Sequence, residues 1–138
     1  MNVKYDANLI GQINFFEKIT RTRVKECFTF KEKLTFMVNP EQLGRALGNN
    51  KMNLHKLEKV FNKSLRIIEY NDDMLQFIQN LIAPLRVVKI SEENGVVTIV
   101  GPDTKTKGLM IGSKAKNLRE TESIVQKYFP ELQEIKVV

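Results

Sequence analysis

Apolar side chains along the chain alternate between the spacing of helices and the spacing of strands. Near the N-terminus, Leu9, Ile13 and Phe16 recur every three to four residues, so they fall on one face of a helix predicted over residues 6–19. Asp6 suits the N-cap of that helix, because its carboxylate can accept a free backbone N–H group. The chain therefore opens with an amphipathic helix.

The rest of the first half is predicted from the same kind of pattern. A run rich in β-formers over residues 24–30 and an alternating run over 34–38 indicate a hairpin of two strands. Asn39 and Pro40 suit the start of a short helix that ends near Gly48. A longer helix and a strand over residues 65–68 complete this half.

The second half repeats the order of the first. Its predicted elements are a helix opened by Asn71-Asp72-Asp73, strands over 85–90 and 96–100 around the turn Asn94-Gly95, a short helix capped by Asp103, a helix over 114–128, and a strand over 132–138. The order α-β-β-α-α-β therefore occurs twice, which predicts an α+β protein with domains over residues 1–70 and 71–138.

One stretch returns clearly enough to mark an internal repeat. Residues 44–54 recur as residues 108–118, and five pairs carry the match: Gly44/Gly108, Leu47/Ile111, Gly48/Gly112, Asn53/Asn117 and Leu54/Leu118. No linker rich in Gly, Ser or Pro separates the halves, and each half alone would bury only a modest core. We therefore expect the two domains to pack together as one rigid body.

Charge is distributed unevenly between the halves. The net charge is +6, and residues 1–70 carry all of it, with 13 Lys and Arg against 7 Asp and Glu, while residues 71–138 have 9 of each. A basic surplus favours a polyanionic partner, because Lys and Arg displace counterions from phosphates. A charge that serves solubility alone is the competing interpretation.

Several classes of protein find no support in the composition. No apolar run is long enough for a membrane span, and the first residues lack the apolar core of a signal peptide. The single cysteine, Cys27, and the single histidine, His55, leave no disulfide and no plausible zinc set. No P-loop pattern or acid–base set is present. We expect a cytoplasmic, non-enzymatic protein without cofactor, metal or small-molecule substrate.

Each copy of the repeat places a short polar, basic loop between two helices. The loops are Gly48-Asn49-Asn50-Lys51 and Gly112-Ser113-Lys114-Ala115. Glycine lets backbone approach a phosphate closely, and free N–H groups at a helix N-terminus attract anions. The expected role is a clamp on a nucleic-acid backbone, although any single lysine near it also fits a solvated helix face.

A hydrophobic-Gly-x-x-Gly-x-x-hydrophobic loop in the order α-β-β-α-α-β resembles the type II KH domain. Two such domains in one short chain resemble the archaeal NusA-like transcription factors, as do the segments Arg23–Cys27, Val38–Gly48, Ile68–Asp73 and Leu81–Pro84. This resemblance implies two domains, each with a three-stranded sheet covered by helices. It also implies binding of single-stranded nascent RNA, and a role in transcription elongation or termination with RNA polymerase as partner.

The resemblance also implies which residues contact RNA. They are Arg45, Gly48, Asn49, Asn50, Lys51, Asn53, Lys107, Gly112, Ser113, Lys114, Ala115, Lys116 and Asn117. For Asn53 and Asn117, bracing of the loop backbone is the alternative role. For Gly44 and Gly108, we expect that glycine permits close packing of the short helix.

Both loops depart from the family pattern at its second glycine, which is Lys51 in one copy and Ala115 in the other. A Cβ at this position crowds a phosphate and disfavours a left-handed turn. A second hypothesis is therefore a protein-interaction module that docks on RNA polymerase or ribosomal components without strong RNA affinity.

Overall fold

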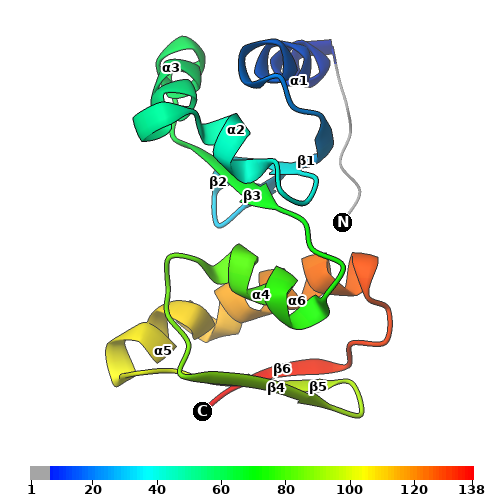
Figure 1. Cartoon of the computed structure of the whole chain (residues 1–138). Coiled ribbons are helices and arrows are strands. Elements are labelled where there is room, and N and C mark those ends of the chain that lie inside the picture. The colour runs from blue at the N-terminus through cyan, green and yellow to red at the C-terminus, as the bar shows by residue number, and fades with distance from the viewer. Residues whose placement is uncertain (1–6) are drawn as a thin grey trace. The chain divides into compact units, whose positions relative to one another are not determined.

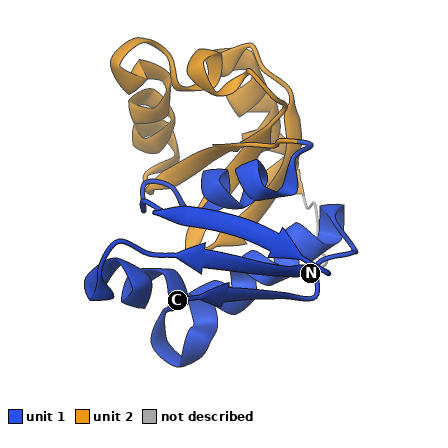
Figure 2. Ribbon diagram, turned by 60° about the horizontal axis from the view of Figure 1, so that its bottom comes forward, with its two compact units in different colours: residues 1, 72–138 blue, residues 2–71 orange. Residues whose placement is uncertain are grey.

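The computed structural model describes residues 7–138 and has an α+β architecture built from two sheets (Figure 1). The chain divides into two compact units, and the boundary lies between Asn71 and Asp72 (Figure 2). We call them the N-terminal unit, orange in Figure 2, and the C-terminal unit, blue in Figure 2. Asp6, the expected cap of the first helix, lies outside the described residues.

Over the described residues 7–71, the N-terminal unit consists of a three-stranded mixed sheet and three α-helices. Its elements are α1 (Ala7–Thr20), β1 (Val24–Phe30), β2 (Lys33–Val38), α2 (Leu43–Leu47), the 3-10 turn η1 (Asn49–Lys51), α3 (Met52–Phe61) and β3 (Leu65–Glu69). The strands lie in the order β1-β2-β3, with β1 antiparallel and β3 parallel to β2. Phe36, at the centre of the register, pairs with Cys27 on one side and Ile67 on the other.

Helix packing buries one face of this sheet. Phe16 of α1, Phe36 of β2 and Leu57 of α3 are fully buried in one cluster, and the rings of Phe16 and Phe36 stack with centroids 4.3 Å apart. Alternate residues point to the opposite face. That face is also apolar and buried, with Phe30 and Met37 at 0% exposure.

The C-terminal unit repeats the topology. Its elements are α4 (Met74–Ile82), β4 (Lys89–Glu93), β5 (Val96–Val100), α5 (Thr104–Ile111), the 3-10 turn η2 (Ser113–Ala115), α6 (Lys116–Tyr128) and β6 (Glu134–Val137). The order is β4-β5-β6, again with one antiparallel and one parallel pairing. Here Val97, Ile99 and Ile135 are buried, whereas most of β4 is exposed. The helices cover one side of this sheet (Figure 1).

Three local predictions for the C-terminal unit are confirmed. The Asp73 carboxylate caps α4 by accepting the Leu75 N–H at 3.2 Å, and Asp103 caps α5 by accepting the Thr106 N–H at 2.7 Å. Asn94 and Gly95 form the turn between β4 and β5, both with positive φ (52° and 83°). These hydrogen bonds and dihedral angles fix where each element begins and ends.

The start of α2 was predicted wrongly. The helix begins at Leu43 rather than at Pro40, because Glu41 has a left-handed backbone (φ 69°) that no helix can contain. Gln42 occupies the N-cap without a side-chain hydrogen bond. The free Leu43 N–H instead donates to the carboxylate of Glu69, at the end of β3, over 3.1 Å.

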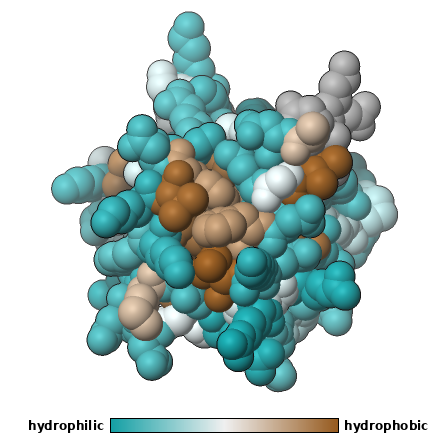
Figure 3. Space-filling view, turned by 90° about the horizontal axis from the view of Figure 1, so that it is seen from above, coloured by the Kyte–Doolittle hydropathy of each residue, from teal (hydrophilic) through white to brown (hydrophobic). Residues whose placement is uncertain are grey.

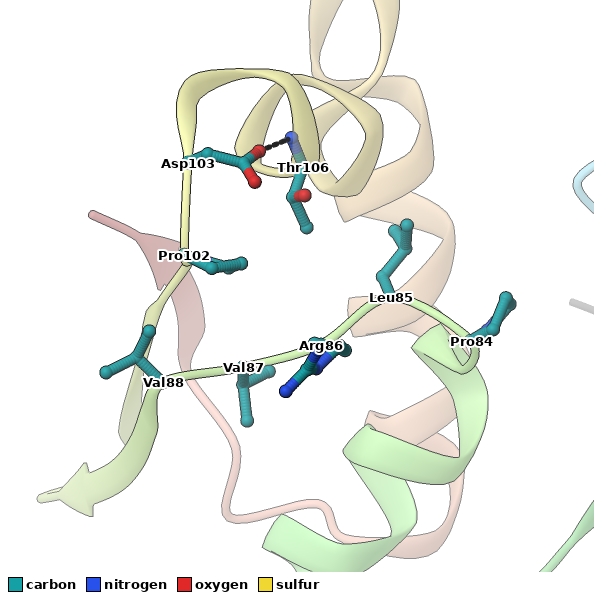
Figure 4. Close-up of a pocket in the computed structure, with 8 residues that line it drawn as sticks. All are labelled: Pro84, Leu85, Arg86, Val87, Val88, Pro102, Asp103 and Thr106. Carbon is teal, nitrogen blue, oxygen red and sulfur yellow. Dashed lines mark hydrogen bonds between the residues drawn. The ribbon is translucent and has the colours of Figure 1, made fainter.

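The start of β4 was also predicted too early. Pairing with β5 begins with the Val88 N–H, which donates to the Val100 carbonyl, and the strand proper starts at Lys89 rather than at residue 85. The preceding segment lines a pocket of about 480 Å³ (Figure 4). The lining residues are Pro84, Leu85, Arg86, Val87, Val88, Pro102, Asp103 and Thr106.

A glutamate on the last helix of each unit holds the strand that follows it. Glu58 of α3 accepts the Leu65 N–H at 2.9 Å, and Glu122 of α6 accepts the Ile135 N–H at 2.8 Å. The two glutamates occupy matching positions of the repeat. Each carboxylate therefore satisfies a backbone donor where its strand joins the sheet.

Candidate nucleic-acid interface

The two predicted loops adopt the same backbone conformation. The first glycine of each ends a short helix, Gly48 with φ 77° and ψ 172°, and Gly112 with φ 75° and ψ 173°. Only glycine populates this region readily. The matching dihedral angles show that the two copies of the repeat share a backbone conformation as well as a sequence pattern.

The last two residues of each loop are left-handed although none is glycine. Asn50 and Lys114 both have φ 53° and ψ 33°, and Lys51 (φ 58°) and Ala115 (φ 60°) take the same region. A Cβ in this conformation costs about 1–2 kcal/mol. Both loops therefore hold the same left-handed turn without glycine at these positions, at a cost in backbone energy.

An asparagine braces each loop from the following helix. Asn53 Nδ2 donates to the Arg45 carbonyl at 3.2 Å, and Asn117 Nδ2 donates to the Leu109 carbonyl at 3.0 Å. These bonds support the bracing role considered for the two asparagines, and they reach the last turn of the preceding helix rather than the loop itself. The two side chains also pass close to the loop glycines, since a Cβ on Gly112 would lie 2.7 Å from the Asn117 Cγ.

The helices that follow the loops begin without neutralising groups. The N-cap residues of α3 and α6, Lys51 and Ala115, make no side-chain capping bond, and neither helix has an acidic residue in its first turn. The partial positive charge of a helix N-terminus is therefore unopposed by these groups. Such an end, beside lysine side chains, is suited to an anion.

Most of the predicted residues lie together around the loop of their own unit. The exposed ones are Arg45, Asn49, Asn50, Lys51, Ser113, Lys114 and Lys116, and the partly buried ones are Gly48, Asn53, Gly112, Ala115, Asn117 and Lys107. Lys107 differs from the rest, because its side chain lies over Gly101 at the N-terminal end of α5. The loop follows the opposite end of that helix.

The expected packing role of Gly44 and Gly108 was wrong. Both are exposed, and a Cβ on either would meet no heavy atom within 4 Å. The absent side chains instead leave the last turn of α2 and of α5 open beside each loop. Sequence alone did not predict this, because a glycine in a helix gives no sign of which face it occupies.

Three further features of the described residues are an ionised helix cap, the absence of a membrane-spanning helix and the absence of a metal-binding cluster. Hydrogen bonding from the Thr106 N–H lowers the pKa of the Asp103 carboxyl, which keeps this cap ionised. Over residues 7–138, no helix has the length and apolar character needed to cross a bilayer. The same residues contain no cluster of three or more His, Cys, Asp or Glu side chains arranged to hold a metal ion.

Comparison with solved structures supports the fold. The crystal structure of APE1850 superposes with a TM-score of 0.66 at 24% sequence identity, covering 94% of this chain and 96% of that one. No family model matches the chain.

Comparison with curated proteins identifies the class as archaeal transcription termination proteins. A probable transcription termination protein NusA of Methanocaldococcus jannaschii is 30% identical over 99% of this chain and 75% of its own length. That of Methanococcus vannielii is 31% identical, over 86% and 70%. That of Thermoplasma acidophilum is 26% identical, over 92% and 90%. The chain belongs to the archaeal NusA-like family, which confirms the family predicted from its sequence.

Proposed function

We propose that this protein is a non-enzymatic RNA-binding factor of transcription, in which each unit is a type II KH domain that grips single-stranded nascent RNA. In this proposal it acts in elongation or termination alongside RNA polymerase. The observation that carries the proposal is the matching conformation of the two loops, Gly48–Lys51 and Gly112–Ala115. Membership of the NusA-like family and the repeated α-β-β-α-α-β order support it.

The chemistry of each loop suits a phosphate. The N-termini of α3 and α6 have no side-chain cap and no acidic residue in the first turn, and exposed Lys51 and Lys114 add positive charge. Neither loop contains an acidic side chain. The open backbone at Gly44 and Gly108 leaves room for a strand to pass along the preceding helix. Together these features favour backbone contacts over base recognition at the loop.

Charge reversal at the loops tests the proposal. Binding of unstructured RNA to the full chain should weaken by about tenfold or more in Lys51→Glu and in Lys114→Glu, because each change replaces a phosphate contact with repulsion. The salt dependence should also become shallower, by about one in the slope of log K against log salt. Fluorescence anisotropy over a salt series measures both quantities.

Lys136→Glu is the matched control. It makes the same charge change on an exposed residue of β6, an element that carries neither loop. Equal weakening by all three variants would show that only net charge matters. Absence of binding to any RNA pool at low salt would contradict the proposal and leave the protein-interaction module as the better hypothesis.

A further inference from the structure

A groove between α1 and α3 lies outside the proposed RNA loops. It has a volume of about 470 Å³. Its lining residues are Ala7, Asn8, Gly11, Gln12, Phe15, Val60 and Phe61. Figure 3 looks onto the side of the molecule that carries these helices in Figure 1, and shows apolar side chains gathered centrally among hydrophilic ones. The groove belongs wholly to the N-terminal unit.

Several apolar side chains at the groove and on α3 are exposed or only half-buried, unlike those of the core. Val60 is 54% exposed, and Met52, two helical turns earlier on the same stripe of α3, is 62% exposed. Phe15 and Phe61 are half-buried, with ring centroids 5.7 Å apart and planes tilted by 59°. These side chains form the kind of half-open apolar surface that receives an apolar side chain from a partner.

Gly11 lies within α1 and lines this groove. It has no positive φ, and a Cβ there would meet nothing within 4 Å, so neither backbone geometry nor packing requires glycine. Glycine inside a helix costs about 1 kcal/mol relative to alanine. The helix bears that cost at a position where the missing side chain deepens the groove.

Over the described residues, the exposed charged side chains of α1 and α3 are all basic. Each of the two helices has one glutamate, and both glutamates bond strand backbone: Glu17 accepts the Val24 N–H at 2.8 Å, and Glu58 accepts the Leu65 N–H at 2.9 Å. On the outer surface, helical spacing places Lys18 on the stripe of Gly11 and Phe15. Lys56 lies one turn before Val60, and Lys63 follows it by three residues. All three lysines are exposed.

We propose that the α1–α3 groove is a docking site for an acidic amphipathic helix of a protein partner. Its apolar side chains would enter between Phe15 and Val60, close to the Gly11 backbone, and its carboxylates would face Lys18 and Lys56. This arrangement is the helix-in-groove mode of recognition, with charge complementarity setting the choice of partner. The tilted Phe15 and Phe61 rings, packed against each other, present no flat aromatic platform of the kind on which RNA bases stack.

The test uses the full chain labelled with ¹⁵N and two designed helical peptides of about 16 residues, a length at which a helix begins to be stable. Both carry the same apolar stripe, but one has Glu and the other Lys at the flanking positions. We expect the Glu peptide to shift the amide signals of Ala7–Phe15 and Val60–Phe61, and to bind at least about tenfold more tightly than the Lys peptide, through charge selectivity.

Two substitutions should abolish this binding. Gly11→Met fills the groove while improving helix propensity, and Lys56→Glu reverses the charge on the rim. Ser123→Met, on the exposed surface of α6, is the control for an added methionine. Gly11→Met, which changes no charge, should still bind RNA as the unaltered chain does, so failure of this proposal and failure of the RNA proposal are distinguishable.

Four results would overturn the proposal. They are equal binding of the two peptides, no binding of either at millimolar concentration, shifts of the groove amides on adding an RNA oligonucleotide, and self-association of the chain that Gly11→Met abolishes. The third would make the groove an RNA surface, and the fourth would make it an interface between two copies. Sedimentation velocity of the chain alone measures the fourth.

Discussion

Gly108 and Gly112 lie one helical turn apart, but an added methyl group meets a different environment at each. At Gly108 the backbone is helical and a Cβ contacts nothing within 4 Å. At Gly112 the backbone has φ 75°, and a Cβ would lie 2.7 Å from the Asn117 side chain that braces the loop. Substitutions at these two positions therefore distinguish a glycine that only leaves surface open from a glycine that the backbone conformation requires.

We expect Gly112→Ala to lower the free energy of unfolding by more than about 2 kcal/mol, because strain and the collision with Asn117 add together. Gly108→Ala should leave stability unchanged or raise it by about 0.5–1 kcal/mol, since alanine is the better helix former. Urea unfolding of the two variants measures the difference. Equal effects would show that the loop geometry tolerates any side chain.

Cys27 is fully buried on the core face of β1. Burial, with a smaller contribution from the charge of Glu26, raises the pKa of the Cys27 thiol to about 12. In the unfolded chain the thiol loses its proton near pH 8.5. Between these values the folded state holds one proton more than the unfolded state, so its stability falls as the pH rises.

We expect the free energy of unfolding to decline above about pH 8.5 by up to ~1.4 kcal/mol per pH unit from this one thiol. Cys27→Ala should remove that part of the decline, although the variant is less stable at neutral pH because it leaves a small cavity. Denaturant unfolding from pH 7 to 10 compares the slopes. Parallel slopes for the two proteins would contradict the assignment.

At the scale of elements, the matching glutamates of α3 and α6 join each helix to its following strand. Glu122 is 7% exposed and also accepts a hydrogen bond from Arg119 at 2.9 Å. Removing its carboxylate leaves the Ile135 N–H buried without an acceptor. An unsatisfied buried donor costs about 1–3 kcal/mol.

Glu122→Ala should therefore destabilise the chain by about 1–3 kcal/mol, and Glu122→Gln by less, because the amide oxygen still accepts the Ile135 N–H. Ser123→Ala, on the exposed side of the same helix, serves as the control and should change stability by under about 0.5 kcal/mol. Hydrogen exchange at the Ile135 amide gives a second readout. Unchanged protection there in Glu122→Ala would show that the bond is dispensable.

The order of elements was predictable from sequence because the repeat supplies every assignment twice. The Asp73 and Asp103 caps and the Asn94-Gly95 turn were predictable for a local reason, since each acts within a few residues. The start of α2 was not, because the left-handed Glu41 and the bond from Leu43 to Glu69 depend on contact with a strand 26 residues later. Tertiary contacts of this kind leave no periodic signal.

The candidate site was predictable in position but not in all its parts. The repeat located both loops, yet the direction in which Gly44, Gly108 and Lys107 face follows from helix orientation, which a sequence does not state. The α1–α3 groove had one signal in the sequence, Gly11 inside an amphipathic helix. Its significance emerges only once the structure shows that no packing contact requires glycine there.

For the whole molecule, the expectation that the two units form one rigid body stays a prediction. Ile67→Val removes one buried methylene from the core of the N-terminal unit and should cost about 0.5–1.5 kcal/mol. If the body is rigid, amides of both units should unfold together at a lower urea concentration.

Urea titration followed by residue-resolved NMR makes this measurement. A lowered midpoint for residues 7–71 with an unchanged midpoint for residues 72–138 would show that the units unfold independently. The paired change Ile135→Val, in the C-terminal unit, provides the reciprocal experiment.

The identical turns of the two loops bear on how RNA length would govern occupancy. If each turn grips a phosphate chain weakly, a strand that reaches one loop gains one weak contact, whereas a strand that reaches both makes the second contact intramolecularly. The longer strand then binds more tightly because its second segment is held at a high effective concentration near the second loop, and no new kind of contact is needed. Nascent RNA lengthens as it is made, so a protein with two modest grips would engage a transcript according to how much of it has emerged.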